Sequence, residues 1–268
     1  MTPALIIAVL AVLLTAMVLR AVFGFGDAMF AIPLLAALVG LERGAPVLAL
    51  SGTVMAVLLL RERPSLVDGG AVLRLLLGAA AGTPLGILVL VAVPEVWGHR
   101  ILGALVLGFG LWALAKEHRA RQAKTEGESP TPVTSEETAT EPGPLRRWLR
   151  DLPFGLIAGV TSAAFDIAGP SLLAYAVVRS WSDDALRINL QAVFLPLGIF
   201  TIAGHGVAGL WTREVLMLAA MGLPVMLLGY FVGGKLRVVV RARFGENAGK
   251  RLLLALIIGL GVFELVGS

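Results

Sequence analysis

Cysteine is absent from this chain of 268 residues, and only three histidines occur in it. Without cysteine there are no disulfides, no thiol chemistry and no cysteine-ligated metal. The histidines, His99, His118 and His205, share no metal-ligand spacing. The nucleophile elbow, the phosphate loop and the zinc-helix motif are missing as well. We therefore expect no enzyme, no metal and no other cofactor.

Charge is also scarce: charged residues make up 15% of the chain, hydrophobic residues make up 57%, and the mean hydropathy is +0.89. This balance excludes an ordinary soluble domain. The alternating segments typical of transmembrane strands are not visible. Apolar runs long enough for a helix to cross a bilayer occur at 4–22, 45–60, 71–93, 99–115, 188–210, 214–234 and 251–267. We predict an all-α polytopic membrane protein embedded in the lipid bilayer.

One polar segment divides the chain into two halves. Residues 116–150 are rich in proline, threonine and glutamate and too hydrophilic to pack, so we interpret them as a linker between repeats at 1–115 and 151–268. The segment 98–114, "GHRILGALVLGFGLWAL", aligns without gaps to 249–265, "GKRLLLALIIGLGVFEL", with eight identities. This similarity indicates an internal duplication.

Each half begins with a broken apolar segment. In the second half the arms 152–165 and 170–178 are too short to cross alone, which predicts a re-entrant hairpin. In the first half the arm 28–39 is equally short, but the arm before it is long enough to span, so half and full spans both remain open there. A hairpin returns to its starting side and three crossings follow it in each copy. The two copies are therefore predicted to have inverted topology.

The basic residues test this layout. If the linker is cytoplasmic, 18 of the 22 lysines and arginines fall inside, and only Arg43, Arg100 and Arg213 fall in outside loops. Arg20 is the remaining one, within the first hairpin. The positive-inside rule then places the linker in the cytoplasm and both termini in the periplasm of a cell (inner) membrane protein. The net charge of +4 lies in short loops, so it indicates orientation and not nucleic-acid binding.

The two breaks have the composition of a ligand site. Irregular backbone at membrane depth is tolerated where it lines a cavity, and half-helix N-termini from inverted repeats attract anions there. Gly24, Gly26 and Gly169 allow the backbone to turn, and Pro33 and Pro170 suit the first turn of a short helix. We expect both breaks to converge on one small anionic substrate.

The motifs "GFGDAMFAIPLL" (24–35) and "GVTSAAFDIAGPSLLAY" (159–175), together with the duplicated layout and the polar linker, resemble the sulfite exporter TauE/SafE family, the toluene-sulfonate-uptake permease group. The resemblance covers nearly the whole chain except the linker. It implies a secondary transporter for small organic or sulfur-containing anions such as sulfite, sulfonates or sulfoacetate. The chain departs from the more glycine-rich form of the motif by having Asp27 and Asp166.

Asp27 and Asp166 have two interpretations. Aspartate is a good N-cap, so both side chains could cap the short helices. Alternatively, a desolvated carboxyl group beside a bound anion favours its protonated form, which would couple anion binding to proton binding. Ionisable residues within membrane segments are functional candidates in general.

Further polar residues complete the predicted substrate-binding set, which is Phe25, Gly26, Asp27, Ser51, Thr53, Asp166, Gly169, Asn189, Gln191 and His205. Ser51 and Gln191 occupy matching positions of the two copies when Ala45 is aligned with Ala185. Interhelical hydrogen bonding is the alternative role for such residues, and a structural role is the alternative for His205. Arg187 shares a helix face with Gln191, and we expect it to extend to the cytoplasmic interface.

Three functions compete at this point. The leading prediction is a secondary anion transporter, with proton coupling through Asp27 and Asp166. An anion channel would share the broken helices but need no coupling acid. An intramembrane enzyme would need both carboxylates within hydrogen-bonding reach. A homo-oligomer is compatible with each of the three.

Overall fold

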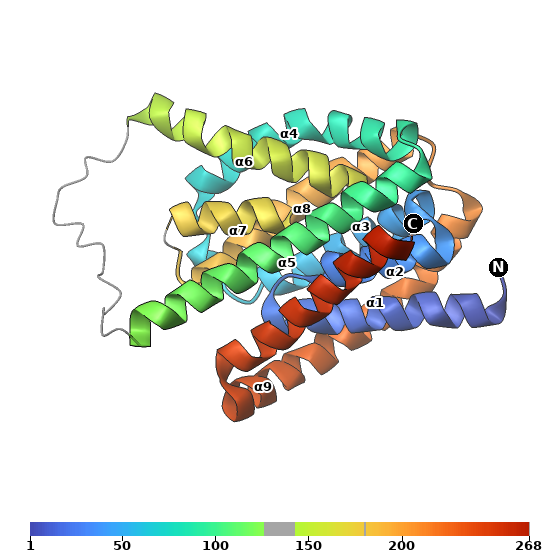
Figure 1. Ribbon diagram of the computed structural model, residues 1–268. Helices are drawn as coiled ribbons and strands as arrows, with labels where there is room; N and C mark the ends of the chain where they lie inside the picture. Colours follow the sequence, from blue (N-terminus) through green and yellow to red (C-terminus); the bar gives the residue numbers. More distant parts are fainter. Residues whose placement is uncertain (126–142, 180, 268) are drawn as a thin grey trace.

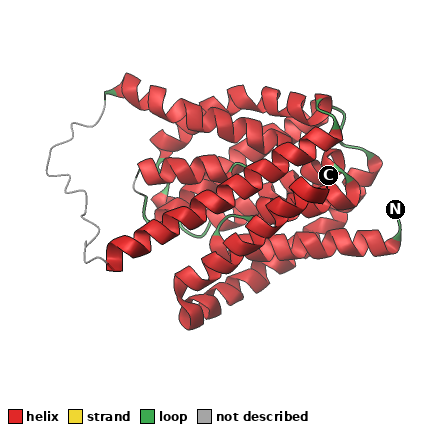
Figure 2. Cartoon of the chain, in the orientation of Figure 1, coloured by secondary structure: helices red, strands yellow, loops and turns green. Residues whose placement is uncertain are grey.

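The computed structural model describes residues 1–125, 143–179 and 181–267, and in these ranges it contains helices and loops but no strand (Figures 1 and 2). The helices are α1 (Pro3–Phe23), α2 (Asp27–Val39), α3 (Leu41–Leu60), η1 (a 3-10 turn, Pro64–Leu66), α4 (Gly69–Ala92), α5 (Glu95–Thr125), α6 (Pro144–Phe165), α7 (Gly169–Val178), α8 (Asp183–Val207) and α9 (Arg213–Gly267). The prediction of an all-α polytopic protein is confirmed.

Six helices of the described part are long and apolar enough to cross a membrane: 3–23, 41–60, 69–92, 96–116, 184–207 and 213–240. They coincide with the first six predicted apolar runs. The seventh run, 251–267, lies at the end of α9, where Leu254–Phe263 is a shorter apolar stretch. Figure 1 shows that α9 folds back on itself, with a first arm (orange) along α1 and a second arm (red) along α5.

Side-chain caps define where three of the spans begin. Thr2, Asp68 and Ser182 precede α1, α4 and α8, and a side-chain oxygen of each accepts a hydrogen bond from an N–H in the first helical turn. The first N–H groups of a helix have no partner within it, so a cap replaces the missing acceptor. The polar residues that interrupt the apolar runs thus set the helix starts.

The two hairpins start from opposite sides of the molecule. In Figure 1 the N-terminus lies at the right, whereas the end of α5 and the start of α6 lie at the left. We call these faces the terminus side and the linker side. The hairpin α1–α2 enters from the terminus side, and the hairpin α6–α7 enters from the linker side. Three passes follow each hairpin, an order consistent with two inverted copies.

The matched segments of the two copies pack against each other. A Cβ on Gly110 of α5 would lie 2.6 Å from Cγ1 of Ile258, and one on Gly261 of α9 would lie 2.8 Å from Cβ of Leu107. In the alignment of 98–114 with 249–265, Gly110 pairs with Gly261 and Leu107 pairs with Ile258. The two contacts therefore exchange when the copies are exchanged, as a two-fold relation between them requires.

The two copies are interleaved and do not form separate bundles. Helix α4 of the first copy packs along α6 of the second, and the first arm of α9 packs along α1. At the first of these interfaces, Cβ atoms on Gly78 and Gly82 would meet the backbone carbonyl oxygens of Leu152 and Leu156. Small residues let helix backbones approach closely in a membrane, where lipid offers no hydrophobic driving force between helices. Each hairpin is thus held by a span of the other copy.

A buried polar cluster joins α4, α6 and α7 on the linker side. Asp151 is fully buried and accepts hydrogen bonds from Arg74 Nε at 2.7 Å, Arg150 Nε at 2.9 Å and the Tyr175 hydroxyl at 2.9 Å. A buried carboxylate is tolerated when its oxygens are paired in this way. The cluster ties the start of the second hairpin to the first copy.

The polar segment predicted as a linker, 116–150, is helical at both ends. Helix α5 continues to Thr125 and α6 begins at Pro144, while residues 126–142 lie outside the described part of the chain. The first arm of the second hairpin is therefore longer than the predicted 152–165. The additional residues at its start include Arg150 and Asp151.

The glycine packing leads to a stability prediction. Gly82→Ala places a Cβ against the carbonyl oxygen of Leu156, so α4 and α6 must separate. We expect the free energy of unfolding to fall by about 1–3 kcal/mol, measured by thermal unfolding in detergent. Gly108→Ala is the matched control because nothing lies within 4 Å of the Cβ position there. Equal destabilisation by both changes would contradict the proposed close contact.

Candidate functional site

The helical structure is interrupted at equivalent positions in the two hairpins. Helix α1 ends at Phe23 and α2 begins at Asp27, while α6 ends at Phe165 and α7 begins at Gly169. The residue after each first arm is left-handed: Gly24 has φ 86° and Asp166 has φ 56°. By this register Gly24 corresponds to Asp166, and Asp27 corresponds to Gly169. The two aspartates therefore occupy different positions of the repeat.

Neither aspartate caps a short helix. The N-cap residues of α2 and α7 are Gly26 and Ala168, and neither helix has a side-chain cap hydrogen bond. Asp27 is the first residue of α2, as predicted, but Asp166 ends α6 and does not begin α7. Aspartate is one of the few residues other than glycine that tolerate a left-handed conformation. The capping interpretation is wrong for both residues.

The prolines behave differently in the two hairpins. Pro170 lies in the first turn of α7, as predicted. Pro33 lies inside α2, and its predicted position in a first turn is wrong. The reason is that Gly24 and Gly26, both with positive φ, complete the turn early, so that α2 begins at Asp27. About half of α2 therefore precedes Pro33.

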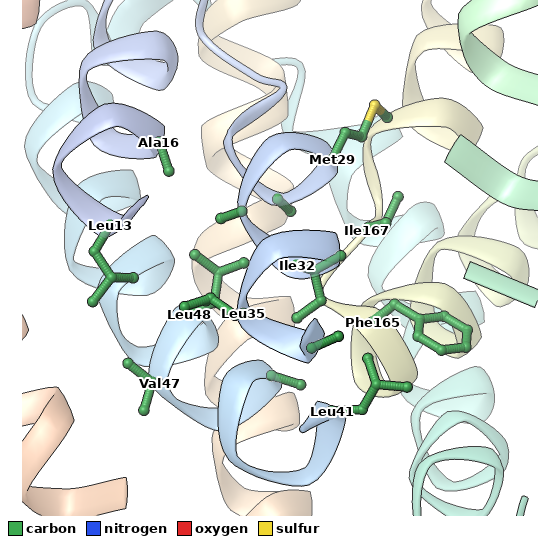
Figure 3. Packing of buried hydrophobic residues seen from close by; sticks show 14 of the residues in the cluster. Leu13, Ala16, Met29, Ile32, Leu35, Leu41, Val47, Leu48, Phe165 and Ile167 are labelled. Atoms are coloured by element: carbon green, nitrogen blue, oxygen red, sulfur yellow. The ribbon is translucent and has the colours of Figure 1, made fainter. Parts of the chain in front are cut away.

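The tips of the hairpins enclose a cavity of about 30 Å³, which is room for one or two water molecules. Five residues of the predicted substrate set from the hairpins, together with Thr53 of α3, line it: Phe25, Gly26, Asp27, Thr53, Asp166 and Gly169. The wall also includes Arg20, Gly52, Ser162, Phe194 and Gly198. Figure 3 shows the apolar packing next to this region, where Met29 and Ile32 of α2 lie near Ile167. The predicted convergence of the two breaks on one cavity is present in the fold.

Arg20 is the central charge of this cavity. Its Nη1 donates to Asp27 Oδ2 at 2.8 Å and its Nη2 donates to Gln191 Oε1 at 3.0 Å. The guanidinium lies over the Phe194 ring, 4.9 Å from the ring centroid, and Nε has no hydrogen-bond partner. Arg20 is 4% exposed. A buried guanidinium held by one carboxylate, with a spare N–H group, is a ready partner for an oxyanion.

Sequence reasoning did not select Arg20 as a site residue. The available signal was its position: among the basic residues it alone falls within the first broken hairpin and not in a loop or the linker. A basic residue at membrane depth is costly unless it is paired or faces a polar cavity. The pairing with Asp27 became visible only in the fold, although seven residues separate the two in sequence.

Gln191 and Ser51 differ in their hydrogen-bond partners. Gln191 Nε2 donates to the carbonyl oxygen of Gly24 at 2.8 Å, so this side chain joins α8 to the first break and to Arg20. Ser51 Oγ donates to Val47 O at 3.0 Å within its own helix and does not line the cavity. Gln191 therefore holds Arg20 and the first break in place, whereas Ser51 lies outside the cavity.

Asp166 faces the cavity without a hydrogen bond to its side chain from the described residues. A Cβ on Gly52 would lie 3.0 Å from Arg20 Nη1 and 3.6 Å from Asp166 Oδ2. The bare backbone of Gly52 thus leaves space in which Asp166 and Arg20 approach each other. With both carboxylates ionised, Arg20, Asp27 and Asp166 carry a net charge of −1.

Asn189 lies away from the cavity, at the linker side. Its Oδ1 accepts the Asp68 N–H at 2.7 Å and its Nδ2 donates to Leu66 O at 3.1 Å. Asp68 also binds Arg179 at 2.9 Å. Burial opposes ionisation of Asp68, but the Ala71 N–H and the Arg179 guanidinium outweigh it and hold the pKa of Asp68 below its usual value. Asn189 and these neighbours fasten the loop before α4.

His205 and Arg187 are buried outside the cavity. The ring nitrogen Nε2 of His205 lies 3.0 Å from Ala163 O, and His205 is 0% exposed. Arg187 is 7% exposed, and its Nη2 contacts Glu62 Oε2 at 3.3 Å. The expected extension of Arg187 toward the cytoplasmic interface stays a prediction: its guanidinium pairs with Glu62, just after the end of α3 on the linker side, and its Cγ lies close to Gly24 of the first break.

The family model described as "Sulfite exporter TauE/SafE" matches residues 8–263 of the chain. No curated protein and no solved structure matches it. The matched range includes both helix breaks and the cavity residues named above.

The buried ion pair leads to a second stability prediction. Asp27→Asn removes the carboxylate that accepts a hydrogen bond from the buried guanidinium of Arg20, and we expect a loss of about 3–5 kcal/mol of unfolding free energy. Combining it with Arg20→Gln should recover part of this loss, which gives a large coupling energy in a double-mutant cycle.

Arg43 and Glu214 form the matched control pair, with nitrogen and oxygen 3.1 Å apart and both side chains about half exposed. Their coupling energy should stay below about 1 kcal/mol. A coupling at Arg20 and Asp27 no larger than that of the control would mean that water reaches the buried pair.

Proposed function

Because the chain belongs to the sulfite exporter TauE/SafE family, we propose that it is a secondary transporter for a small sulfur-containing or organic anion such as sulfite, a sulfonate or sulfoacetate. The observation that carries this proposal is the buried guanidinium of Arg20 between the two helix breaks. Guanidinium groups bind multi-oxygen anions with paired, charge-assisted hydrogen bonds. The site is proposed to lie at the hairpin tips, near the middle of the membrane.

In this proposal Asp27 occupies the place of the substrate. It neutralises Arg20 when no anion is bound, and the incoming anion competes with it for the same N–H groups. Gln191 holds the other side of the guanidinium, so Arg20 keeps its orientation while the partner changes. Phe25, Gly26, Thr53 and Gly169 form the walls around the anion.

The size of the cavity implies a conformational step. About 30 Å³ accommodates water but not a sulfonate. The anion therefore enters only if the hairpin tips move apart, and the tips are joined to their helices by the short breaks at 24–26 and 166–168. A closed central cavity of this kind favours alternating access over the other candidate, an open anion channel.

Proton coupling is proposed for Asp27 and Asp166. A carboxylate repels a bound anion, and protonation removes the repulsion. Asp166 has no hydrogen-bond partner among the described residues, so its protonation breaks no existing bond, whereas protonation of Asp27 weakens its hold on Arg20. An anion that prefers the protonated site raises the proton affinity of that site by the same factor.

Transport assays in proteoliposomes test the site. Arg20→Gln should reduce uptake of a sulfonate at least tenfold, since a charge-assisted hydrogen bond contributes about 1.5–3 kcal/mol. Wild-type uptake should rise as the pH falls, because protonated carboxyl groups no longer repel the anion. A sulfonate is a useful substrate here because it stays anionic throughout.

Asp166→Asn should retain uptake but lose most of this pH dependence, because asparagine cannot titrate. Glu214→Gln, an exposed change of the same kind, is the control and should behave like the wild type. Saturation with substrate but no response to a proton gradient in the wild type would remove the coupling from the proposal. Uptake that does not saturate would favour the channel.

The orientation is also a proposal: the linker side faces the cytoplasm, and both termini face the periplasm. It rests on the distribution of basic residues. Reporter fusions within 126–142 should be active in the cytoplasm, and fusions at either terminus should be active in the periplasm. The opposite pattern would contradict this orientation.

A further inference from the structure

A second cleft opens at the linker side, separate from the central cavity. Its volume is about 600 Å³, and its charged lining consists of Glu62, Arg63, Asp184, Arg187 and Arg237. The residues come from the loop that follows α3, from the start of α8 and from residues 234–242 of α9. The cleft is large enough for a small hydrated anion, unlike the central cavity.

The charges in this cleft do not balance. Arg63 pairs with Asp184 at 3.1 Å and Arg187 pairs with Glu62 at 3.3 Å, while Arg237 reaches the same two carboxylates only at 3.8 and 3.9 Å. Among the lining residues in the described part of the chain, three cations thus share two carboxylates. A cleft lined in this way attracts a further negative charge.

Arg187 is the feature that points to a ligand. Its Nε and Nη1 are buried and have no hydrogen-bond partner among the residues that the structure describes, although the residue is only 7% exposed. Its contacts with Glu62 are 3.3 and 3.4 Å long, whereas charge-assisted bonds of this type are normally about 2.7–2.9 Å. Leaving guanidinium donors buried without acceptors is unfavourable. An anion with several oxygens would supply the missing acceptors.

We infer that this cleft is a second oxyanion site, in which Arg187 binds a sulfur oxyanion in place of Glu62, with Arg237 as the second cation. The carboxylate of Glu62 occupies the position in the absence of the anion. The shape of the ligand follows from the donors: a planar guanidinium favours an anion that presents two oxygens side by side, as sulfate, sulfite and sulfonates do.

Contacts join this site to the central one. The Arg187 carbonyl oxygen accepts a hydrogen bond from Gln191 Nε2 at 3.4 Å, and Gln191 binds Arg20. A Cβ on Gly24 would lie 2.9 Å from Arg187 Cγ, so the side chain covers the first break from the linker side. An anion that draws Arg187 toward the cleft would uncover that break. A role as loading site for transport rests on the proposed function, but anion binding itself does not.

Calorimetric titration of the detergent-purified full chain with sodium sulfate, at constant ionic strength, tests the site. The wild type should bind sulfate saturably, and Arg187→Gln should weaken that binding at least tenfold. Arg61→Gln is the matched control: it removes the same charge on the same side, next to Glu62, but Arg61 does not line the cleft. It should change the dissociation constant less than twofold.

Glu62→Gln keeps Arg187 in place and removes the internal competitor, so it should tighten sulfate binding. This variant keeps the test decisive if Arg187→Gln does not fold. Arg20→Gln, in the central cavity, should leave cleft binding within twofold of the wild type. Sulfate binding that is lost in Arg20→Gln but kept in Arg187→Gln would overturn the second site while supporting the central one. Absence of saturable binding, or no tightening by Glu62→Gln, would also overturn it.

Discussion

The ion pair of Arg20 and Asp27 is the constraint on which the centre of this protein depends. A guanidinium in the membrane interior must be paired and hydrogen-bonded, and here one carboxylate and the Gln191 amide satisfy it. Arg20 and Asp27 come from the two arms of the first hairpin, and Gln191 comes from α8 of the second copy. The pair thus keeps the broken backbone at 24–26 in one place beside the polar cavity.

Interleaving of the copies gives that cavity its position. Helix α6 is packed against α4 through backbone contacts at glycine, and α1 is packed against the first arm of α9. Each hairpin tip is therefore carried by spans of the other copy. A shift of one copy relative to the other would move both tips and change the distance between Arg20 and Asp166. Such a geometry suits a site that must open toward one side at a time.

The number and order of the helices could be predicted largely from the pattern of apolar and polar residues in the sequence. Apolar length predicted the spans, the polar run separated the copies, and glycine with proline marked both breaks. Of the residues predicted to bind substrate, which stays a prediction, Asn189 and His205 contact backbone groups elsewhere, while six line one cavity: Phe25, Gly26, Asp27, Thr53, Asp166 and Gly169. Their polarity alone could not separate these roles, because a polar residue in a membrane helix satisfies a loop, a neighbouring helix or a ligand equally well.

The sequence by itself determined that the chain is helical, crosses a membrane repeatedly and is broken twice, because bilayer thickness and backbone hydrogen bonding act on local stretches of residues. Only the tertiary structure decided that Arg20 pairs with Asp27, that Asp166 follows a first arm while Asp27 begins a second, and that Arg187 pairs with Glu62. Each of these depends on side-chain directions at a helix break and on contacts between residues far apart in the chain. Small differences in dihedral angle at Gly24, Gly26 and Asp166 set those directions, and no periodicity in the sequence encodes them.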